Sequence, residues 1–410
     1  MIHELTAGRA RQLGLVTRAL TPIVKGGARR LLKWRPEGSV TVQLPTGQKI
    51  RFGQPGQTAE AELRLHNYGL LAKALRRGTI GVADAYIDGD VECPDLTALF
   101  RFFLTNVDKF EQAGGGLFRA RMADRVAHLF RRNTHRGSRR NISEHYDLGN
   151  DFYRLWLDRD MNYSSALYTR GGASLEEAQR AKLDLILDFL ELAGGESVLE
   201  IGCGWGAFAR RAAARHGARV TGVTLSHEQL AHARRQAALH GLDDRCAFRL
   251  QDYRDVTGHY DRIVSIEMVE AVGEENWRRY FDIVHDRLKP GSTAAIQSIT
   301  IDERRFEKYR RKADFIQRYI FPGGMLPTPE RLARHAGRAG LSVDRVETFG
   351  ACYARTLGAW QTRFETAWPD IAKLGFDERF CRKWRYYLAY CEAGFAEGAI
   401  DVGVYRLRKS

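Results

Sequence analysis

A glycine-rich turn within residues 198–206 constrains this chain more than any other stretch. A short apolar run ends at Glu200-Ile201, glycines follow at positions 202, 204 and 206, and the alanine-rich segment 207–214 comes next. This order predicts a strand, a tight turn and a helix, the first half of a βαβ unit. Glycines let a ligand approach the backbone, and a helix start offers free N–H groups. The turn is therefore a candidate nucleotide site, although glycines also serve close packing of a helix on a strand.

Strands and helices alternate on both sides of this turn. Helices are predicted at 174–192 and 229–240, and further strands at 220–226, 247–253, 260–267 and 292–301. This rhythm predicts an α/β fold, Rossmann-like, with a mostly parallel, doubly wound sheet whose ligand lies at the carboxyl ends of the strands. Two later strands, near 343–349 and 402–407, are expected to form an antiparallel edge.

The rest of the chain suggests three parts. Residues 1–111 are expected to form a small α+β domain, with a hairpin at 38–52 and a strand near 61–65 before helical runs. Residues 112–141 form an arginine-rich linker, and residues 142–410 form the main domain. A length of 410 residues is sufficient for two or three domains with cores of their own.

Charge and cysteine usage bear on partners and location. The net charge is +14, with 64 Lys and Arg against 50 Asp and Glu, which suits either nucleic acid or an anionic membrane surface. The basic segment 1–35 is expected to be helical. No apolar run has membrane-spanning length, so membrane contact is expected to be peripheral. Six cysteines without a metal-type pair suggest reduced thiols and a cytoplasmic protein, at the inner face of the cytoplasmic membrane.

Three motifs carry a family resemblance. They are Glu200–Gly206, Thr221–Ser226 with Gln229, and Tyr319–Pro327. Together they resemble the cyclopropane fatty acid synthase family, which includes mycolic acid cyclopropane synthases, over roughly residues 140–400. Tyr86–Cys93 resembles the N-terminal domain of members that act on phospholipids. The resemblance implies a class I methyltransferase that uses S-adenosylmethionine to add a carbon to the double bond of an acyl chain in a membrane phospholipid.

The resemblance also implies a cofactor site without a metal. It places Tyr163 and Ser164 on the methionine part, and Asp252 with Tyr253 beside the adenine. Glu200 is suited to the hydroxyl or amino groups of the cofactor. The remaining expected contacts follow the first two strands: Gly202, Gly204, Gly206, Thr224, Leu225, Ser226 and Gln229. For Asp252 an ordinary acid at a loop end is the alternative.

The acceptor side needs a group that receives a proton. Methyl transfer to an alkene leaves a carbocation, which must be stabilised and then deprotonated. By resemblance Glu270 is the catalytic carboxylate and Tyr319 the active-site tyrosine, while Glu267 is the rival carboxylate three residues earlier. Five aromatic residues fit either the walls of an acyl channel or plain core: Trp360, Phe364, Tyr386, Tyr387 and Phe395.

Two positions depart from the family pattern. Ser165 stands where ring-forming members have a cysteine, and Gln297 stands where they have a histidine. The resemblance implies that these positions, the glutamate, the tyrosine and the carbonyl of Ile299 hold a bicarbonate that serves as the base. Loss of an imidazole donor weakens an anion site, yet Ser and Gln still donate hydrogen bonds, so the sequence leaves bicarbonate binding open.

We therefore hypothesise a fatty-acyl C-methyltransferase with a methyl- or methylene-branched product. Ring closure by a cyclopropane-fatty-acyl-phospholipid synthase is the alternative. An RNA methyltransferase and a non-catalytic scaffold are more distant alternatives; no RNA-binding module is legible, so no nucleic-acid partner is expected. Residues 302–345 are expected to form a helical lid over the acyl site, and an apolar helical face in the N-terminal domain would allow a homodimer.

Overall fold

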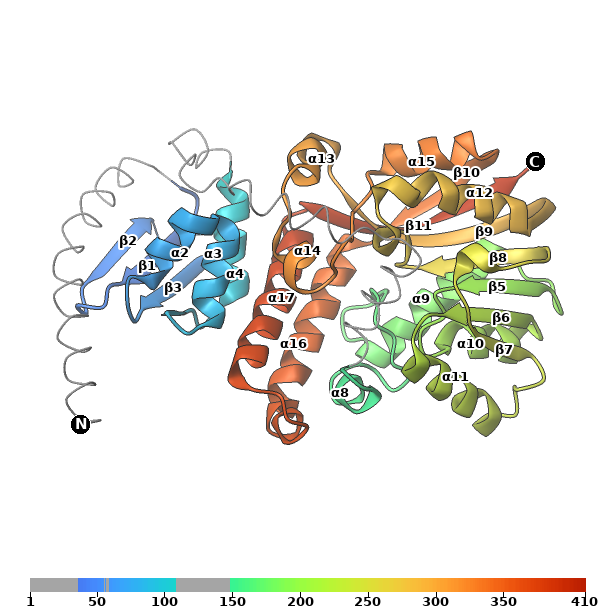
Figure 1. The fold of residues 1–410 in the computed structure, drawn as a ribbon, viewed down its shortest axis with the longest axis horizontal. Helices are drawn as coiled ribbons and strands as arrows, with labels where there is room; N and C mark the ends of the chain where they lie inside the picture. Colours follow the sequence, from blue (N-terminus) through green and yellow to red (C-terminus); the bar gives the residue numbers. More distant parts are fainter. Residues whose placement is uncertain (1–35, 55, 57–58, 108–147) are drawn as a thin grey trace. The chain divides into compact units, whose positions relative to one another are not determined.

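The computed structural model describes residues 36–54, 56, 59–107 and 148–410 (Figure 1). Contacts divide the chain into two compact units, Met1–Arg125 with Phe376–Glu397, and Val126–Gly375 with Gly398–Ser410. The basic segment 1–35 and the basic linker 112–141 lie outside the described residues.

A four-stranded sheet forms the centre of the first unit, in the order β2-β1-β3-β4. The expected hairpin is confirmed, because β1 (Ser39–Gln43) pairs antiparallel with β2 (Lys49–Gly53). β3 (Glu60–Leu65) lies parallel to β1, and β4 (Val91–Glu92) closes the sheet antiparallel to β3. The helices in this part of the sequence are α2 (Gly69–Arg77), α3 (Thr79–Ile87) and α4 (Leu96–Thr105).

A helix from near the end of the chain completes this unit. α17 (Glu378–Ala396) begins at Asp377, whose side chain accepts from the Phe380 N–H, and it packs along α4 and α3. Tyr386 contacts Phe100 edge-on, with ring centroids 4.8 Å apart, and Thr97 Oγ1 lies 3.0 Å from Glu392 Oε2. The sequence-based boundaries assign all residues after 141 to one domain, whereas contacts group Phe376–Glu397 with the first unit.

A seven-stranded sheet forms the centre of the second unit, in the order β10-β11-β9-β8-β5-β6-β7. The parallel strands are β5 (Ser197–Ile201), β6 (Arg219–Thr224), β7 (Cys246–Leu250), β8 (Tyr260–Ile266) and β9 (Leu288–Ile301). β11 (Ile400–Lys409) is antiparallel to both β9 and β10 (Leu341–Thr348), as the sequence predicts. The order reverses beside β5, the position at which ligands bind to doubly wound sheets.

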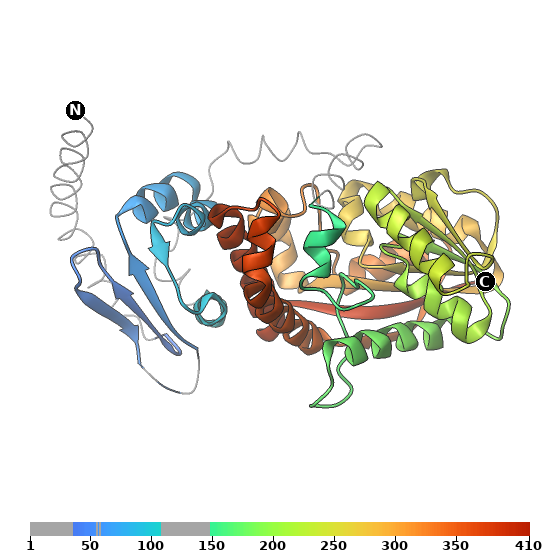
Figure 2. The same ribbon diagram turned by 90° about the horizontal axis from the view of Figure 1, so that it is seen from below.

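Helices cover both faces of this sheet. α9 (Leu175–Leu190) and α12 (Trp277–Arg287) both pack on β8 and β9, and Figure 2 shows them on opposite faces. α10 (Ala207–His216) and α11 (His227–Leu239) pack on β6 and β7, and α15 (Pro329–Arg338) packs on β10. The other helices of this unit are α8 (Asn150–Arg154), α13 (Glu303–Arg310), α14 (Phe315–Tyr319) and α16 (Gly350–Lys373). The apolar core lies between the sheet and α12, where Trp277, Tyr280 and Phe281 are buried.

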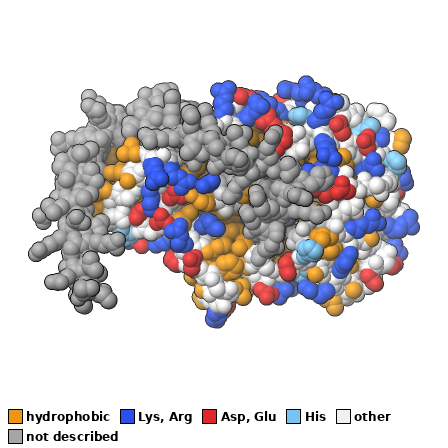
Figure 3. Space-filling view, viewed as in Figure 1, with side chains coloured by type: hydrophobic (Ala, Val, Ile, Leu, Met, Phe, Trp, Pro, Cys, Tyr) orange, Lys and Arg blue, Asp and Glu red, His pale blue; other side chains and the backbone are white. Residues whose placement is uncertain are grey.

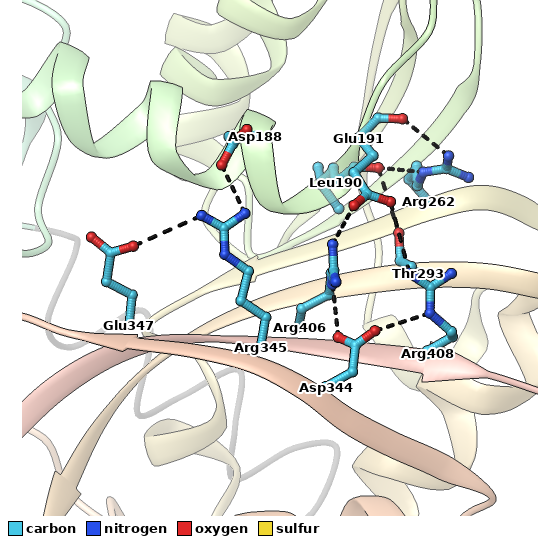
Figure 4. A network of polar contacts seen from close by, with 10 residues as sticks. All are labelled: Asp188, Leu190, Glu191, Arg262, Thr293, Asp344, Arg345, Glu347, Arg406 and Arg408. Carbon is cyan, nitrogen blue, oxygen red and sulfur yellow. Dashed lines mark hydrogen bonds and ion pairs between the residues drawn. The ribbon is translucent and has the colours of Figure 1, made fainter.

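A polar network ties the end of α9 to the antiparallel edge (Figure 4). Glu191 ends the helix in the left-handed conformation (φ 51°), and its carboxylate pairs with Arg406 of β11. Asp344, at a bulge in β10, accepts from Arg406 at 2.7 Å and from Arg408 at 2.9 Å. Arg345 reaches Asp188 at 2.8 Å. These half-exposed pairs hold the edge strands beside α9.

Candidate active site

The glycine turn has the structure that the sequence predicts. It joins β5 to α10, and the N–H groups of Gly202 and Cys203 both donate to the Val223 carbonyl, each at 3.0 Å. Gly202 has a φ of 79°, and a Cβ there would lie 2.8 Å from the Met268 side chain. Gly206, with a φ of 80°, is the N-cap of α10. The turn therefore depends on glycine for its conformation and for its close approach to the neighbouring loop.

Glu200 is a buried carboxylate at the carboxyl end of the central strand. It is 3% exposed, and its Oε2 has no hydrogen-bond partner among the described residues. Burial raises the pKa of Glu200 to about 8, although Lys182 and Arg210 oppose that rise. A ligand with hydroxyl or amino donors would satisfy Oε2, so this position fits the polar part of a nucleoside.

The residues after β6 form a compact local cluster. Thr224 Oγ1 donates to Gln229 Oε1 at 2.8 Å and accepts from the Ser226 N–H at 3.1 Å. Ser226 is the N-cap of α11, and its hydroxyl accepts from the Gln229 N–H at 3.2 Å. Leu225 lies between them in the sequence. Hydrogen bonds at a helix start thus bring the predicted residues together.

Asp252 lies after β7 and is already paired. Arg254 donates to its two carboxylate oxygens at 2.8 and 2.6 Å, and both side chains are buried. Tyr253 follows at the start of the 3₁₀ turn Tyr253–Asp255. The charge of Asp252 is therefore compensated within the chain.

Tyr163 and Ser164 lie beside a buried lysine that the sequence analysis missed. The Tyr163 ring packs 5.4 Å from that of Trp360, between ring centroids. Ser164 Oγ lies 2.8 Å from Nζ of Lys182, which is 1% exposed on α9. Burial lowers the pKa of Lys182 to about 8, against the opposing charges of Glu267, Asp158 and Glu200.

Glu267 accepts hydrogen bonds from three separate parts of the chain. Its Oε1 accepts from the Ser165 N–H at 2.8 Å and from Gln297 Nε2 at 2.7 Å. Its Oε2 accepts from the Tyr353 hydroxyl at 2.7 Å. Ser165 and Gln297 are both 0% exposed, whereas Glu267 is partly exposed. The two residues that depart from the family pattern therefore meet on one carboxylate.

Glu270 lies in the 3₁₀ turn Val269–Val272 and faces β9. Its Oε1 accepts from the Ile299 N–H, and its Oε2 has no partner within the described parts of the chain. Burial, and then the charge of Glu267, raise the pKa of Glu270 to about 8. Ile299 thus offers its N–H to this carboxyl group, while its carbonyl accepts from Ser298 Oγ at 3.0 Å.

Tyr319 precedes a loop that contacts Glu270. It is the last residue of α14 and is partly exposed, and its ring contacts Phe315. The loop beyond it returns to the site, where the Met325 N–H donates to the Glu270 carbonyl at 2.8 Å. The helices expected over 302–345 are present as α13, α14 and α15.

The predicted aromatic residues divide between the units. Trp360 packs on Tyr163, and Phe364 packs on Phe152, within the second unit. Three others are buried on α17 in the first unit: Tyr386, Tyr387 and Phe395. For these three residues, a place in the hydrophobic core fits better than the wall of an acyl channel. Tyr353 was missed, because a single tyrosine in a helical run gives no local signal.

The family model for mycolic acid cyclopropane synthetase matches residues 133–405, about two thirds of the chain. The chain belongs to this family. It is an S-adenosylmethionine-dependent fatty-acyl methyltransferase or cyclopropane synthase, and the expected methyltransferase fold with a small N-terminal domain is confirmed. The free Glu200 oxygen and the glycine turn fit this cofactor.

Three proteins similar to this chain are informative. It is 39% identical over 353 residues to the tuberculostearic acid methyltransferase UfaA1 of Mycobacterium tuberculosis, covering 83% of this chain and 81% of that protein. It is 37% identical over 339 residues to the cyclopropane-fatty-acyl-phospholipid synthase of Escherichia coli, covering 82% and 85%. The crystal structure of mycolic acid cyclopropane synthase CmaA1 with SAH and CTAB matches with a TM-score of 0.62 and 32% identity, covering 66% of this chain and 98% of that one.

The described residues contain neither a candidate membrane-spanning helix nor a candidate metal site. No helix there is long and apolar enough to cross a bilayer. No group of three or more His, Cys, Asp or Glu side chains in the same residues is arranged to hold a metal ion.

Proposed function

We propose that the protein transfers the methyl group of S-adenosylmethionine to a double-bond carbon of an unsaturated acyl chain in a membrane phospholipid, and that the product is a methyl- or methylene-branched chain. The carrying observation is the hydrogen bond from the Gln297 side chain to the Glu267 carboxylate, which also accepts from the backbone N–H of Ser165. Ring closure remains the alternative product of the same first step.

These hydrogen bonds bear on the product because of what the same positions are expected to do in ring-forming relatives. There they help to hold a bicarbonate, whereas here both donors are directed to a carboxylate of the chain itself. A second anion beside Glu267 would be repelled by its charge. A base of a different kind, fixed to the chain, favours the loss of a different proton.

The names of the relatives support the reaction class without choosing the product. One is a methyltransferase for a branched fatty acid and another is a cyclopropane synthase, with almost equal identities of 39% and 37%. The residues around the two carboxylates are therefore a better guide than overall identity.

The role of each cofactor residue follows from its position. We assign Glu200 and the glycine turn to the polar groups of the nucleoside, and Thr224, Ser226 and Gln229 to its ribose side. Tyr163 and Ser164 are assigned to the methionine part, and Asp252 with Tyr253 to the adenine. The free Oε2 of Glu200 supports the first assignment most directly.

A membrane surface is the proposed location of the substrate. Lys and Arg side chains gather over α13 and α15 (Figure 3). Residues 303–311 and 329–338 contain eight of them against three acidic residues: Arg304, Arg305, Lys308, Arg310, Arg311, Arg331, Arg334 and Arg338, against Glu303, Glu307 and Glu330. An excess of positive charge of this kind attracts anionic headgroups.

The product from a defined lipid tests the proposal. The purified protein is incubated with S-adenosylmethionine and anionic vesicles of a phospholipid with one cis double bond. Proton NMR of the extracted lipid is expected to show methyl-branched or exocyclic methylene alkene signals, and hydrogenation with fragmentation to show the branch position. Upfield cyclopropane ring signals would instead establish the ring-forming alternative.

The more distant alternatives are tested in the same assay. With a labelled methyl group, incorporation into vesicles but not into total RNA is expected. Labelled RNA with unlabelled lipid would support an RNA methyltransferase, and absence of turnover with every lipid would support a scaffold.

A further inference from the structure

We infer that Glu267 is the proton acceptor of this reaction, a carboxylate built into the chain at the position where ring-forming relatives use a free anion. The inference rests on the proposed function and adds the identity of the base. By resemblance alone, Glu270 would take the catalytic role.

Three donors from separate parts of the chain hold this carboxylate. They are the Ser165 N–H before α9, Gln297 Nε2 on β9 and the Tyr353 hydroxyl on α16, at 2.7–2.8 Å. Each donates to Glu267, and hydrogen bonds of this kind favour the ionised form of a carboxyl group. Both oxygens of the carboxylate accept hydrogen bonds, and the residue as a whole is partly exposed.

The backbone at Glu267 is held in a conformation that glycine would adopt more easily. Its φ is 50°, and its N–H donates to the Gln297 carbonyl at 2.8 Å. A side chain in this region costs about 1–2 kcal/mol. Glu191, with a φ of 51°, has a local reason, since it ends α9. Glu267 ends no α-helix, and its conformation directs the carboxylate to donors from three elements.

The two neighbouring carboxyl groups differ in their surroundings. Among the described residues, one oxygen of Glu270 has no hydrogen-bond partner, and burial with the nearby Glu267 charge raises the pKa of Glu270 to about 8. Burial also raises the pKa of Glu267, but Ser165, Tyr353, Lys182 and Gln297 all oppose that rise. Three hydrogen-bond donors face Glu267 and one backbone N–H faces Glu270, so the hydrogen bonds favour the charge on Glu267 over the charge on Glu270.

The proposed step balances without a further reagent. The π electrons of the alkene form the new C–C bond to the methyl carbon, and the C–S electrons remain on sulfur, which leaves a cation on the neighbouring chain carbon. Loss of the proton from the methylated carbon to a Glu267 oxygen gives a methyl-branched alkene. If a hydride first shifts from the methylated carbon, the new methyl group loses the proton and an exocyclic methylene results. A saturated branch would need a reductant and is not part of this step.

Replacement of Glu267 by glycine tests the inference directly. Glycine accepts the backbone conformation at this position, so E267G removes the carboxylate and leaves its three donors in place. In buffer freed of carbon dioxide, release of S-adenosylhomocysteine with unsaturated vesicles is expected to fall about 100-fold or more. Added bicarbonate, formate or acetate is expected to restore at least about a tenth of the wild-type rate, with saturation, by occupying the vacated position.

Glu191 offers a matched control. E191G removes the same side chain from almost the same φ, but in the surface network of Figure 4. This variant is expected to keep the wild-type rate and to show no response to the three anions. The wild-type protein is likewise expected to work without bicarbonate.

Several outcomes would overturn the inference. The first is loss of wild-type activity when bicarbonate is removed. The second is an E267G variant that keeps the wild-type rate without added anions. The third is an E267G variant that binds S-adenosylhomocysteine normally but is not rescued by bicarbonate, formate or acetate. If E267G fails to bind S-adenosylhomocysteine, E267Q is tested in its place. E267Q is expected to retain binding and to react about 100-fold more slowly. An unchanged rate would contradict the role of Glu267 as the proton acceptor. Failure of the proposed function is visible separately, in the wild-type protein, as a ring product or no turnover on lipid.

Discussion

The cofactor side and the acceptor side of this active site are built in different ways. On the cofactor side, Thr224 and Gln229 are five residues apart, and the glycine turn follows directly from the strand that carries Glu200. On the acceptor side, Glu267 is joined to Ser165 over 102 residues and to Tyr353 over 86 residues. One side is specified by adjacent residues, and the other exists only once the sheet and α16 have assembled.

This difference indicates which part of a shared fold can change so that the reaction gives a different product. Cofactor contacts made by backbone and adjacent residues tolerate little change, because each residue also shapes the turn or the helix start. The donors around Glu267 come from separate elements, so one substitution can alter the base without disturbing the fold. Four predictions test this division, from the largest expected effect to the smallest.

The charge of Lys182 acts on Glu200 and on Glu267, so its loss should affect both sides. In K182M, Glu200, Glu267 and Asp158 lose a buried countercharge. We expect about 2–4 kcal/mol lower free energy of unfolding, with losses in both cofactor affinity and turnover. Calorimetric titration measures the cofactor affinity, denaturant unfolding the stability and initial rates the turnover. K373M, at an exposed position of α16, is the control. A defect confined to one side would show that the sides are not coupled through Lys182.

Glu200 should affect the cofactor side alone. In E200Q the carboxylate that we assign to cofactor donors becomes neutral, and a lost charged hydrogen bond of about 1.5–3 kcal/mol corresponds to about a 10- to 100-fold weaker affinity. Turnover at saturating cofactor should change much less. Equilibrium binding of S-adenosylhomocysteine and kcat measure the two effects, with E347Q on exposed β10 as the control. A fall in kcat with unchanged affinity would argue against the assignment.

Tyr353 should affect the acceptor side alone, through the pH dependence. Its hydroxyl lowers the pKa of Glu267, so Y353F raises that pKa and moves the rising limb of the rate–pH profile to higher pH. The Glu267 carboxylate is still faced by Ser165, Lys182, Gln297 and Glu270. The rate at pH 7 should therefore fall only about 3- to 10-fold. Cofactor affinity should not change, and Y260F serves as the control. A profile shifted to lower pH would contradict the contact.

The last prediction concerns stability without cofactor, and it has the smallest effect on activity. The pKa of Glu200 in the folded protein is about 8, above its ordinary value of 4.5, so the folded state binds more protons than the unfolded state between these pH values. The free energy of unfolding should therefore decrease as pH rises from 5 to 8. E200Q should remove that decrease, which is about 3–4 kcal/mol for a pKa that moves from 4.5 to about 8. Denaturant unfolding at the two pH values measures it, and an equal slope in both proteins would show that Glu200 does not titrate in this window.

The same division explains what could be predicted from the sequence. The parallel sheet, its antiparallel edge and the cluster at Thr224, Ser226 and Gln229 follow from patterns within short windows. The family motifs located Glu270, but the hydrogen bonds of Glu267 with Ser165, Gln297 and Tyr353 depend on tertiary contacts that no window contains. Lys182 was missed because a lysine in a helical run ordinarily faces solvent, and only packing shows that it is buried.

The return of α17 to the first unit affects the order in which the protein can fold during synthesis. The N-terminal residues of a chain normally fold first, but here the first unit lacks a packing helix until residues 378–396 have left the ribosome. The second unit is also incomplete at that stage, because β11, the strand between β9 and β10, follows the other strands of its sheet in the sequence. A nascent chain ending at Gly375 would therefore carry two incomplete units, with α3 and α4 uncovered in one and β10 without its pairing strand in the other.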